Sequence, residues 1–155
     1  SDVCSSDLIQ WTTWEREEWL YKGQWYQVNA SGSDWVPKAL KTRYKQFIVD
    51  IDWSRATQHC HQQIWDLHRW LANQSIKHIF FSGHSTFHTI QNRLDWGSYY
   101  MDPYTQDGSY HNWLIQNGGC YAKPGSYHFD AKSHRLWADH VLQYVNRNQI
   151  FDPIK

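Results

Sequence analysis

The sequence predicts an α/β fold in which helices cover both faces of a parallel sheet, giving three layers, α/β/α. Two neighbouring segments carry this prediction. Residues 54–73 repeat apolar side chains at helical spacing, and an apolar strand, residues 76–82, follows them directly. A helix that leads into a buried strand through a tight connection is typical of a βαβ unit with parallel strands. The predicted core-facing stripe of the helix consists of Ala56, Cys60, Ile64, Leu67 and Leu71.

The segments before this helix give weaker signals. Residues 9–12 have the composition of a strand end, and residues 13–21, which are charged and aromatic, are expected to form a short helix or an ordered loop. Residues 22–37 are expected to be a loop because glycine, serine and proline interrupt them. Residues 38–51 are expected to be helical in part.

The second half of the chain alternates one long loop with two helices. Residues 83–108 form the loop, and loops this long inside a compact domain are usually functional. Ser109 is expected to cap a short helix that ends before Asn117-Gly118, and Asp130 is expected to cap a helix over residues 131–146. The predicted inner face of this last helix consists of His134, Trp137, Ala138, Val141 and Val145.

The first eight residues, SDVCSSDL, match the translation of a common short-read sequencing adapter. We therefore expect residues 1–8 to be an assembly artefact, so that Cys4 carries no functional meaning. Residues 9–155 are then expected to form a single domain that lacks its first strands, with the natural sequence continuing upstream of Ile9.

Charge and hydropathy exclude several classes of partner. The 15 basic and 15 acidic residues balance, and no run of Lys and Arg suggests a nucleic-acid surface. No apolar run approaches the ~20 residues that a membrane span needs. The mean hydropathy of −0.79 scores 11 Trp, 10 Tyr and 10 His as polar, although such rings pack well in cores.

Some of these aromatic rings are alternatively expected to be exposed platforms for sugars: Trp96, Tyr99, Tyr100, Tyr104 and Tyr110.

No metal or cofactor site is predicted. His59 and His61 have ligand-like spacing, but residues two apart on a helix point in different directions. His84 and His88 lack the glutamate of an HExxH zinc motif. The three cysteines, without a CxxC pair, indicate neither a disulfide framework nor a zinc knuckle.

The most informative block presents His128 from a loop, two residues before the expected helix cap Asp130. The run from His128 to Ala138 resembles the closing block of the SGNH (GDSL-type) hydrolases, in which a catalytic His precedes a short turn, a His-Arg pair and a Trp-Ala pair. Residues 76–82 stand in the place of the penultimate strand of that fold. Residues 9–16 resemble the strand end of the third block in viral members of the family.

The resemblance implies a role for each matching position. His128 matches the general base, and Thr12 or Thr13 stands where the family's oxyanion-binding Asn lies. Gly125 replaces the acidic residue that usually orients the His. The alternatives for that role are Asp102, Asp107, Asp130 or a backbone carbonyl. The remaining candidates for lining the site are Gly83, His84 and His134.

Two functions follow from these observations. The first is an SGNH-like esterase or acylhydrolase acting on a small-molecule or glycan ester, whose nucleophilic Ser is absent from this chain, so that the fragment itself is expected to be inactive. The second is a carbohydrate-binding or structural protein that keeps the fold without the chemistry.

Overall fold

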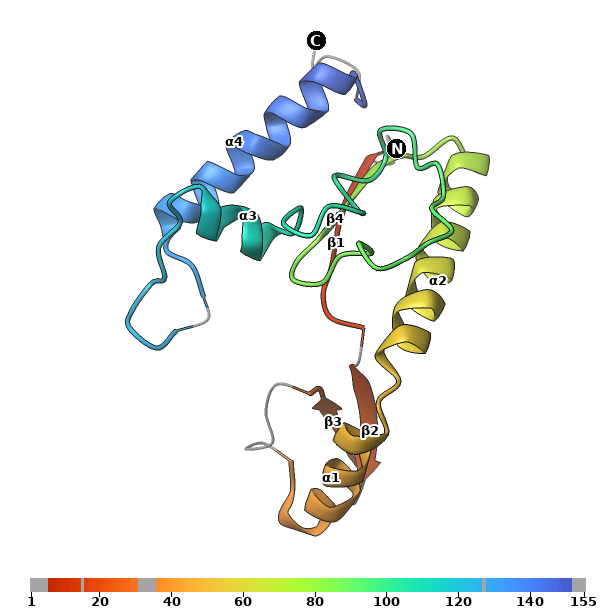
Figure 1. The fold of residues 1–155 in the computed structure, drawn as a ribbon, viewed down its shortest axis with the longest axis vertical. Helices are drawn as coiled ribbons and strands as arrows, with labels where there is room; N and C mark the ends of the chain where they lie inside the picture. Colours follow the sequence, from red (N-terminus) through yellow and green to blue (C-terminus); the bar gives the residue numbers. More distant parts are fainter. Residues whose placement is uncertain (1–5, 15, 31–35, 127, 152–155) are drawn as a thin grey trace. The chain divides into compact units, whose positions relative to one another are not determined.

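The computed structural model describes residues 6–14, 16–30, 36–126 and 128–151 (Figure 1). The chain divides into two compact units, one made of residues 1–12 and 63–155 and the other of residues 13–62. The boundary falls inside helix α2 (Trp53–Asn73). The single domain expected over residues 9–155 stays a prediction.

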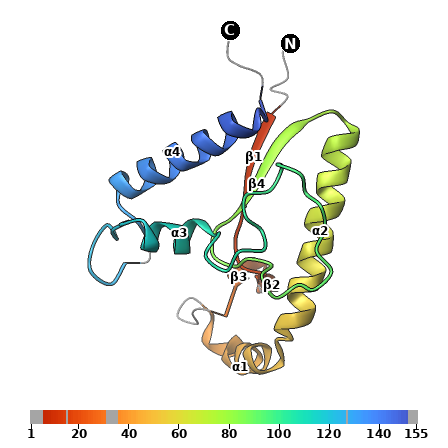
Figure 2. The same ribbon diagram turned by 45° about the horizontal axis from the view of Figure 1, so that its top comes forward.

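A parallel strand pair organises the larger unit. Strands β1 (Ser6–Trp11) and β4 (Lys77–Ser82) run side by side, with Ile9 opposite Phe80 (Figure 2). A third segment joins the other edge of β4 at Tyr100, where Phe80 N–H donates to the Tyr99 carbonyl at 2.8 Å. The predicted α/β class and the parallel arrangement around the strand at residues 76–82 are confirmed.

Strand β1 includes three of the adapter-like residues, Ser6, Asp7 and Leu8, opposite Lys77, His78 and Ile79. A parallel ladder is made by backbone groups, so an extended segment can add to β4 with little help from its side chains. The side chains of Asp7 and Leu8 are accordingly exposed, with Leu8 at 58%.

Helix α2 begins one residue before the predicted start, and Asp52 caps it by accepting the Arg55 N–H at 2.9 Å. Its buried stripe is rotated by one position from the predicted one. Ala56, Cys60 and Leu67 are only half-buried. The stripe that is buried consists of Thr57, His61, Ile64, His68 and Leu71. Ile64 and Leu71 are therefore buried as predicted, whereas Thr57, His61 and His68 are buried in place of Ala56, Cys60 and Leu67. A hydrogen-bonded imidazole such as that of His68 packs in a core like any other ring.

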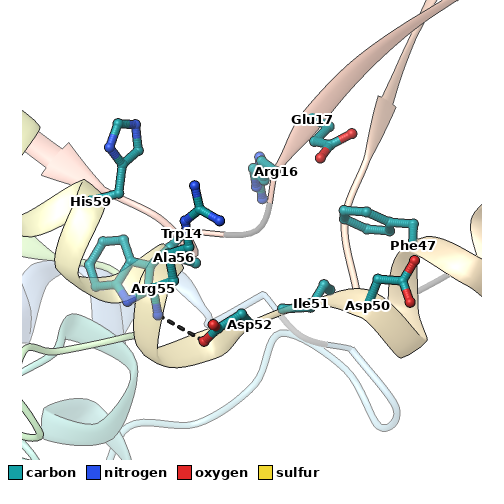
Figure 3. Close-up of a pocket in the computed structure, with 10 residues that line it drawn as sticks. All are labelled: Trp14, Arg16, Glu17, Phe47, Asp50, Ile51, Asp52, Arg55, Ala56 and His59. Atoms are coloured by element: carbon teal, nitrogen blue, oxygen red, sulfur yellow. Dashed lines mark hydrogen bonds between the residues drawn. The ribbon is translucent and has the colours of Figure 1, made fainter.

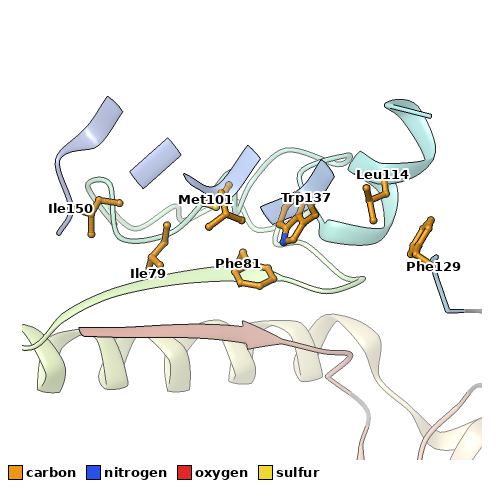
Figure 4. Packing of buried hydrophobic residues seen from close by; sticks show 8 residues of the cluster. Ile79, Phe81, Met101, Leu114, Phe129, Trp137 and Ile150 are labelled. Carbon is orange, nitrogen blue, oxygen red and sulfur yellow. The ribbon is translucent and has the colours of Figure 1, made fainter. Parts of the chain in front are cut away.

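The main core lies between β4 and two further helices, α3 (Tyr110–Gln116) and α4 (Ala131–Asn148), as Figure 4 shows. It consists of Ile79, Phe81, Met101, Leu114, Phe129, Trp137, Val141 and Ile150. The opposite face of β4 is also covered, because His78 is bonded to His68 of α2. Strand β4 is therefore buried on both faces, as its continuous apolar run predicts.

The inner face of α4 differs from the expected one at two positions. His134 and Ala138 are exposed, whereas Ser133, Trp137 and Val141 are the buried residues of the helix. The buried stripe follows the large ring of Trp137, which packs on Phe81 at 5.4 Å between ring centroids. Because the buried face is centred on Trp137, His134 and Ala138 lie near its edge and remain exposed to solvent.

The smaller unit contains an antiparallel hairpin that the sequence analysis missed. Strands β2 (Glu17–Tyr21) and β3 (Gln24–Val28) are joined by Lys22-Gly23, whose φ values of 51° and 79° are those of a type I′ turn. The expected short helix or loop at residues 13–21 and loop at residues 22–37 are therefore wrong for this hairpin. The overlooked signal is a two-residue turn ending in Gly between two aromatic runs.

Helix α1 (Lys41–Asp50) follows a 3-10 turn (Lys38–Leu40) and confirms the partly helical expectation there. The unit has its own small core of Trp19, Val28, Val36 and Tyr44. Among the described helices, none has the length and apolar character needed to cross a membrane.

Candidate functional site

The candidate site lies where β4 ends, at Gly83. The Gly83 N–H donates to the Trp11 carbonyl at the end of β1, and the Gly83 carbonyl accepts the His111 N–H of α3 at 3.0 Å. A Cβ at this position would lie 2.9 Å from the Trp11 carbonyl oxygen and 2.7 Å from Gln10 Nε2. Only glycine therefore lets the two strand ends and the first turn of α3 meet here, and the carboxyl ends of parallel strands are where α/β folds bind ligands.

A cluster of rings covers this strand end. His84 stacks on His111 with 4.6 Å between ring centroids, and His111 Nε2 lies 3.2 Å from the Tyr121 hydroxyl oxygen. Phe129 packs on both His111, at 5.5 Å, and Tyr121, at 5.0 Å. The structure thus brings the predicted Gly83 and His84 together with His111 and Tyr121, which the sequence analysis did not select.

His128 lies on the loop between α3 and α4, next in sequence to Phe129 of the ring cluster. Its backbone is held firmly: the His128 carbonyl accepts the Ala122 N–H at 2.9 Å, and the His128 N–H donates to Ser126 Oγ at 3.0 Å. Its side chain is exposed, and no hydrogen bond from another described residue reaches its ring. His128 thus combines an anchored backbone with a solvent-accessible imidazole.

Asp130 caps α4, as the sequence predicts. Its Oδ1 accepts both the Ser133 N–H and the Ser133 hydroxyl at 2.7 Å. These two hydrogen bonds hold the pKa of Asp130 below its ordinary value, and the bond from the Ser133 hydroxyl has the larger effect. Ser133 Oγ also accepts the Cys120 N–H at 2.8 Å, so the cap ties the loop to the helix. This carboxylate is therefore used in the cap.

The other candidate residues take separate places. His134 is exposed, with Nδ1 3.0 Å from the Tyr110 hydroxyl oxygen. Asp102 is exposed, with a φ of 44°, and its charge raises the pKa of His140 against the stronger lowering by burial. Thr12 is exposed at the end of β1. Thr13 is half-buried and belongs to the other compact unit.

The histidine pairs with ligand-like spacing are also placed. His59 is exposed whereas His61 is buried, so the two rings lie on different faces of α2. His88 Nδ1 lies 3.0 Å from Thr86 Oγ1. Within the part of the chain that the structure describes, no three or more His, Cys, Asp or Glu side chains are grouped to hold a metal ion.

The aromatic residues proposed as sugar platforms are packed. Trp96 and Tyr100 are buried, and Tyr99, Tyr104 and Tyr110 are half-buried. The Trp96 indole donates to the Tyr104 hydroxyl at 2.8 Å, a contact that orders the long loop. The expectation that these rings are exposed is wrong, because loop residues 96–104 fold back against β4 and α2.

Comparisons with known proteins add no relative. No protein-family model matches the chain, and neither the curated proteins nor the solved structures gave a significant match.

Proposed function

We propose that residues 9–155 carry the C-terminal part of an SGNH-type ester hydrolase of three-layer α/β/α architecture, with His128 as its general base. The observation that carries the proposal is the position of the His128 loop. A hydrogen bond from the Cys120 N–H to Ser133 Oγ ties this loop to α4. The rings of Tyr121 and Phe129 on the loop contact His111. The His111 N–H in turn donates to the Gly83 carbonyl at the end of β4. The packing of α2 on one face of β4 and of α4 on the other supports the layered architecture.

In the proposed reaction, His128 takes the proton of a serine hydroxyl as the oxygen attacks an ester carbonyl. The same imidazole then gives the proton to the leaving alcohol. Its accessible ring and anchored backbone fit this role, because a general base must reach the substrate while keeping its position.

The nucleophile of this reaction is assigned to a serine outside residues 9–155. The buried serines of the described chain have other functions: Ser82 Oγ lies 3.0 Å from the Tyr100 hydroxyl oxygen, Ser109 caps α3 and Ser133 bonds Asp130. These three serines are thereby excluded, and the assignment of the nucleophile to sequence upstream of Ile9 rests on the resemblance to the SGNH hydrolases, whose serine follows the first strand.

The proposal is tested on a longer chain. The gene sequence upstream of Ile9 should encode a strand followed by Gly-Asp-Ser or a similar Ser turn, and a protein that contains it should hydrolyse p-nitrophenyl acetate. His128→Ala should lower kcat by about 10²–10⁴-fold, the usual contribution of a general base, without changing the urea midpoint of unfolding. His59→Ala is the matched control, since His59 is also an exposed histidine but belongs to the smaller compact unit, and it should keep kcat within about twofold.

Three results would contradict the proposal. A full-length gene without a Ser turn removes the nucleophile, and an unchanged kcat in His128→Ala removes the base. Hydrolysis by residues 1–155 alone that depends on His128 would contradict the assignment of the nucleophile to sequence outside this chain.

A further inference from the structure

A pocket of about 660 Å³ lies within the smaller unit, in the size range of small-molecule sites (Figure 3). We call it the Arg16–Arg55 pocket. One side of the pocket is formed by Trp14, Arg16 and Glu17, at the start of β2. The other sides are formed by the end of α1 and the start of α2. Its lining consists of Trp14, Arg16, Glu17, Phe47, Asp50, Ile51, Asp52, Arg55, Ala56 and His59.

The three carboxylates of this lining already accept hydrogen bonds from the protein. Glu17 Oε2 accepts the Trp19 indole N–H at 2.6 Å, and Asp50 Oδ1 accepts the Gln46 amide at 2.7 Å. The third carboxylate, Asp52, is the cap of α2, shown by the dashed line in Figure 3.

The two guanidinium groups differ from the carboxylates. Among the described residues, neither the Arg16 nor the Arg55 side chain has a hydrogen bond or ion pair with an acceptor; the contact of Arg55 with Asp52 uses its backbone N–H. Each guanidinium carries five N–H donors in a planar arrangement that matches a carboxylate, and the amino-terminal end of α2 adds a partial positive charge. The pocket therefore offers two guanidinium groups that can donate to an anion, whereas each of its carboxylates already has one oxygen bonded within the protein.

The charge count limits which anion fits. Two arginines against three carboxylates give a formal lining charge of −1 with neutral His59. This charge opposes any anion at long range, and a multiply charged one most, so an anion gains only from direct contact with the guanidinium groups. The rings of Trp14 and Phe47, with Ile51 and Ala56, offer an apolar surface to the rest of the molecule. A single negative charge on an apolar body matches both properties.

We propose that the Arg16–Arg55 pocket binds a small aromatic monocarboxylate, with its carboxylate held by the arginine side chains and its ring against Trp14 and Phe47. The proposal rests on residues of the smaller unit alone. It is independent of the proposed hydrolase function, and either can fail without the other.

The test is isothermal titration calorimetry of the whole chain with 2-naphthoate, compared with the neutral 2-naphthamide of nearly the same shape. Naphthoate should bind at least tenfold more tightly, since the amide cannot form the charge-assisted pair. Arg55→Gln and Arg16→Gln should each weaken naphthoate binding by about tenfold and leave naphthamide binding unchanged. Lys45→Gln, which removes an exposed cation of the same unit outside the pocket, should stay within twofold.

Equal affinity for naphthoate and naphthamide would overturn the proposal, as would no heat of binding at millimolar naphthoate or an equal loss in Lys45→Gln. The naphthoate and naphthamide comparison uses the unsubstituted protein, so it decides the question even if a variant fails to fold. Far-UV circular dichroism of the variants checks folding, which should be kept because the cap of α2 uses the backbone of Arg55 rather than its side chain.

Discussion

Replacing His78 by leucine should lower the free energy of unfolding by about 2–4 kcal/mol. His78 is fully buried in β4, with Nε2 2.8 Å from His68 Nδ1 and Nδ1 2.8 Å from the Ile76 carbonyl oxygen. Because the carbonyl can only accept, His78 Nδ1 carries the proton in this contact, and His78 Nε2 is then placed to accept the His68 Nδ1–H. The two histidines and the carbonyl thus form one directed chain of hydrogen bonds.

The magnitude follows from the groups that leucine leaves without a partner. Leucine fills most of the space but bonds neither the buried His68 ring nor the Ile76 carbonyl. Each unsatisfied buried polar group costs about 1–3 kcal/mol, and the half-buried Ile76 lies at the lower end of that range. The 4.8 Å stacking of His78 on Tyr99 is also lost.

The assay is urea unfolding at pH 7.5, followed by far-UV circular dichroism. His128→Leu is the control, because the same substitution at an exposed histidine should change stability by less than about 0.5 kcal/mol. If His78→Leu cost less than about 1 kcal/mol, or no more than the control, the hydrogen bonds of His78 would not stabilise the fold as expected.

The same pair predicts a pH dependence. Burial, and secondarily the charge of His78, lower the pKa of His68 below its ordinary 6.5, and burial also lowers the pKa values of His61 and His140. A pKa lowered by folding means that the native state favours the neutral ring. Its contribution to stability is therefore complete above about pH 6.5 and is lost as the pH falls through the folded pKa. The free energy of unfolding should therefore fall between pH 7.5 and 5, by up to ~1.4 kcal/mol per pH unit for each such histidine. The fall should be less steep in His78→Leu. A free energy of unfolding that does not change over this pH range would contradict the lowered pKa values.

Three further predictions concern single sites. Gly83→Ala should lower the free energy of unfolding by about 1–3 kcal/mol in urea titrations, since its Cβ meets the Trp11 carbonyl oxygen at 2.9 Å; an unchanged midpoint would show that the strand end has room. Ser109→Ala removes the cap that accepts the Asn112 N–H and should cost about 1 kcal/mol in the same assay, and an unchanged midpoint would show that the cap contributes nothing. Burial raises the pKa of Cys60 to about 12, so at pH 8 this half-buried thiol should react with Ellman's reagent more slowly than exposed Cys120, each measured with the other two cysteines replaced by serine. Equal rates at Cys60 and Cys120 would contradict this prediction.

Much of the local structure could be predicted because its signals lie within a few residues of each other. The periodic helix before β4, the apolar run of β4, and the capping residues Ser109 and Asp130 are local features, and the structure confirms each. The hairpin is equally local, in its Lys22-Gly23 turn, but the prediction takes Gly23 as part of a loop over residues 22–37 and so does not pair the segments on its two sides.

The candidate site could be predicted only in part. The loop position of His128 follows from the sequence, since the cap at Asp130 fixes where α4 begins. Its neighbours do not follow, because His84, His111 and Tyr121 lie far apart in the chain and meet through the backbone bond between α3 and Gly83.

The sequence by itself determined which segments are helix or strand and which residues cap them, since backbone preference and hydrophobic period act over one or two turns. Tertiary structure alone decided which histidines are buried and which remain in solvent. A ring such as His68 enters a core only when another segment supplies its hydrogen-bond partner, here His78 of β4, because an unpartnered buried imidazole costs more than its burial gains. His128, whose ring has no such partner among the described residues, stays at the surface.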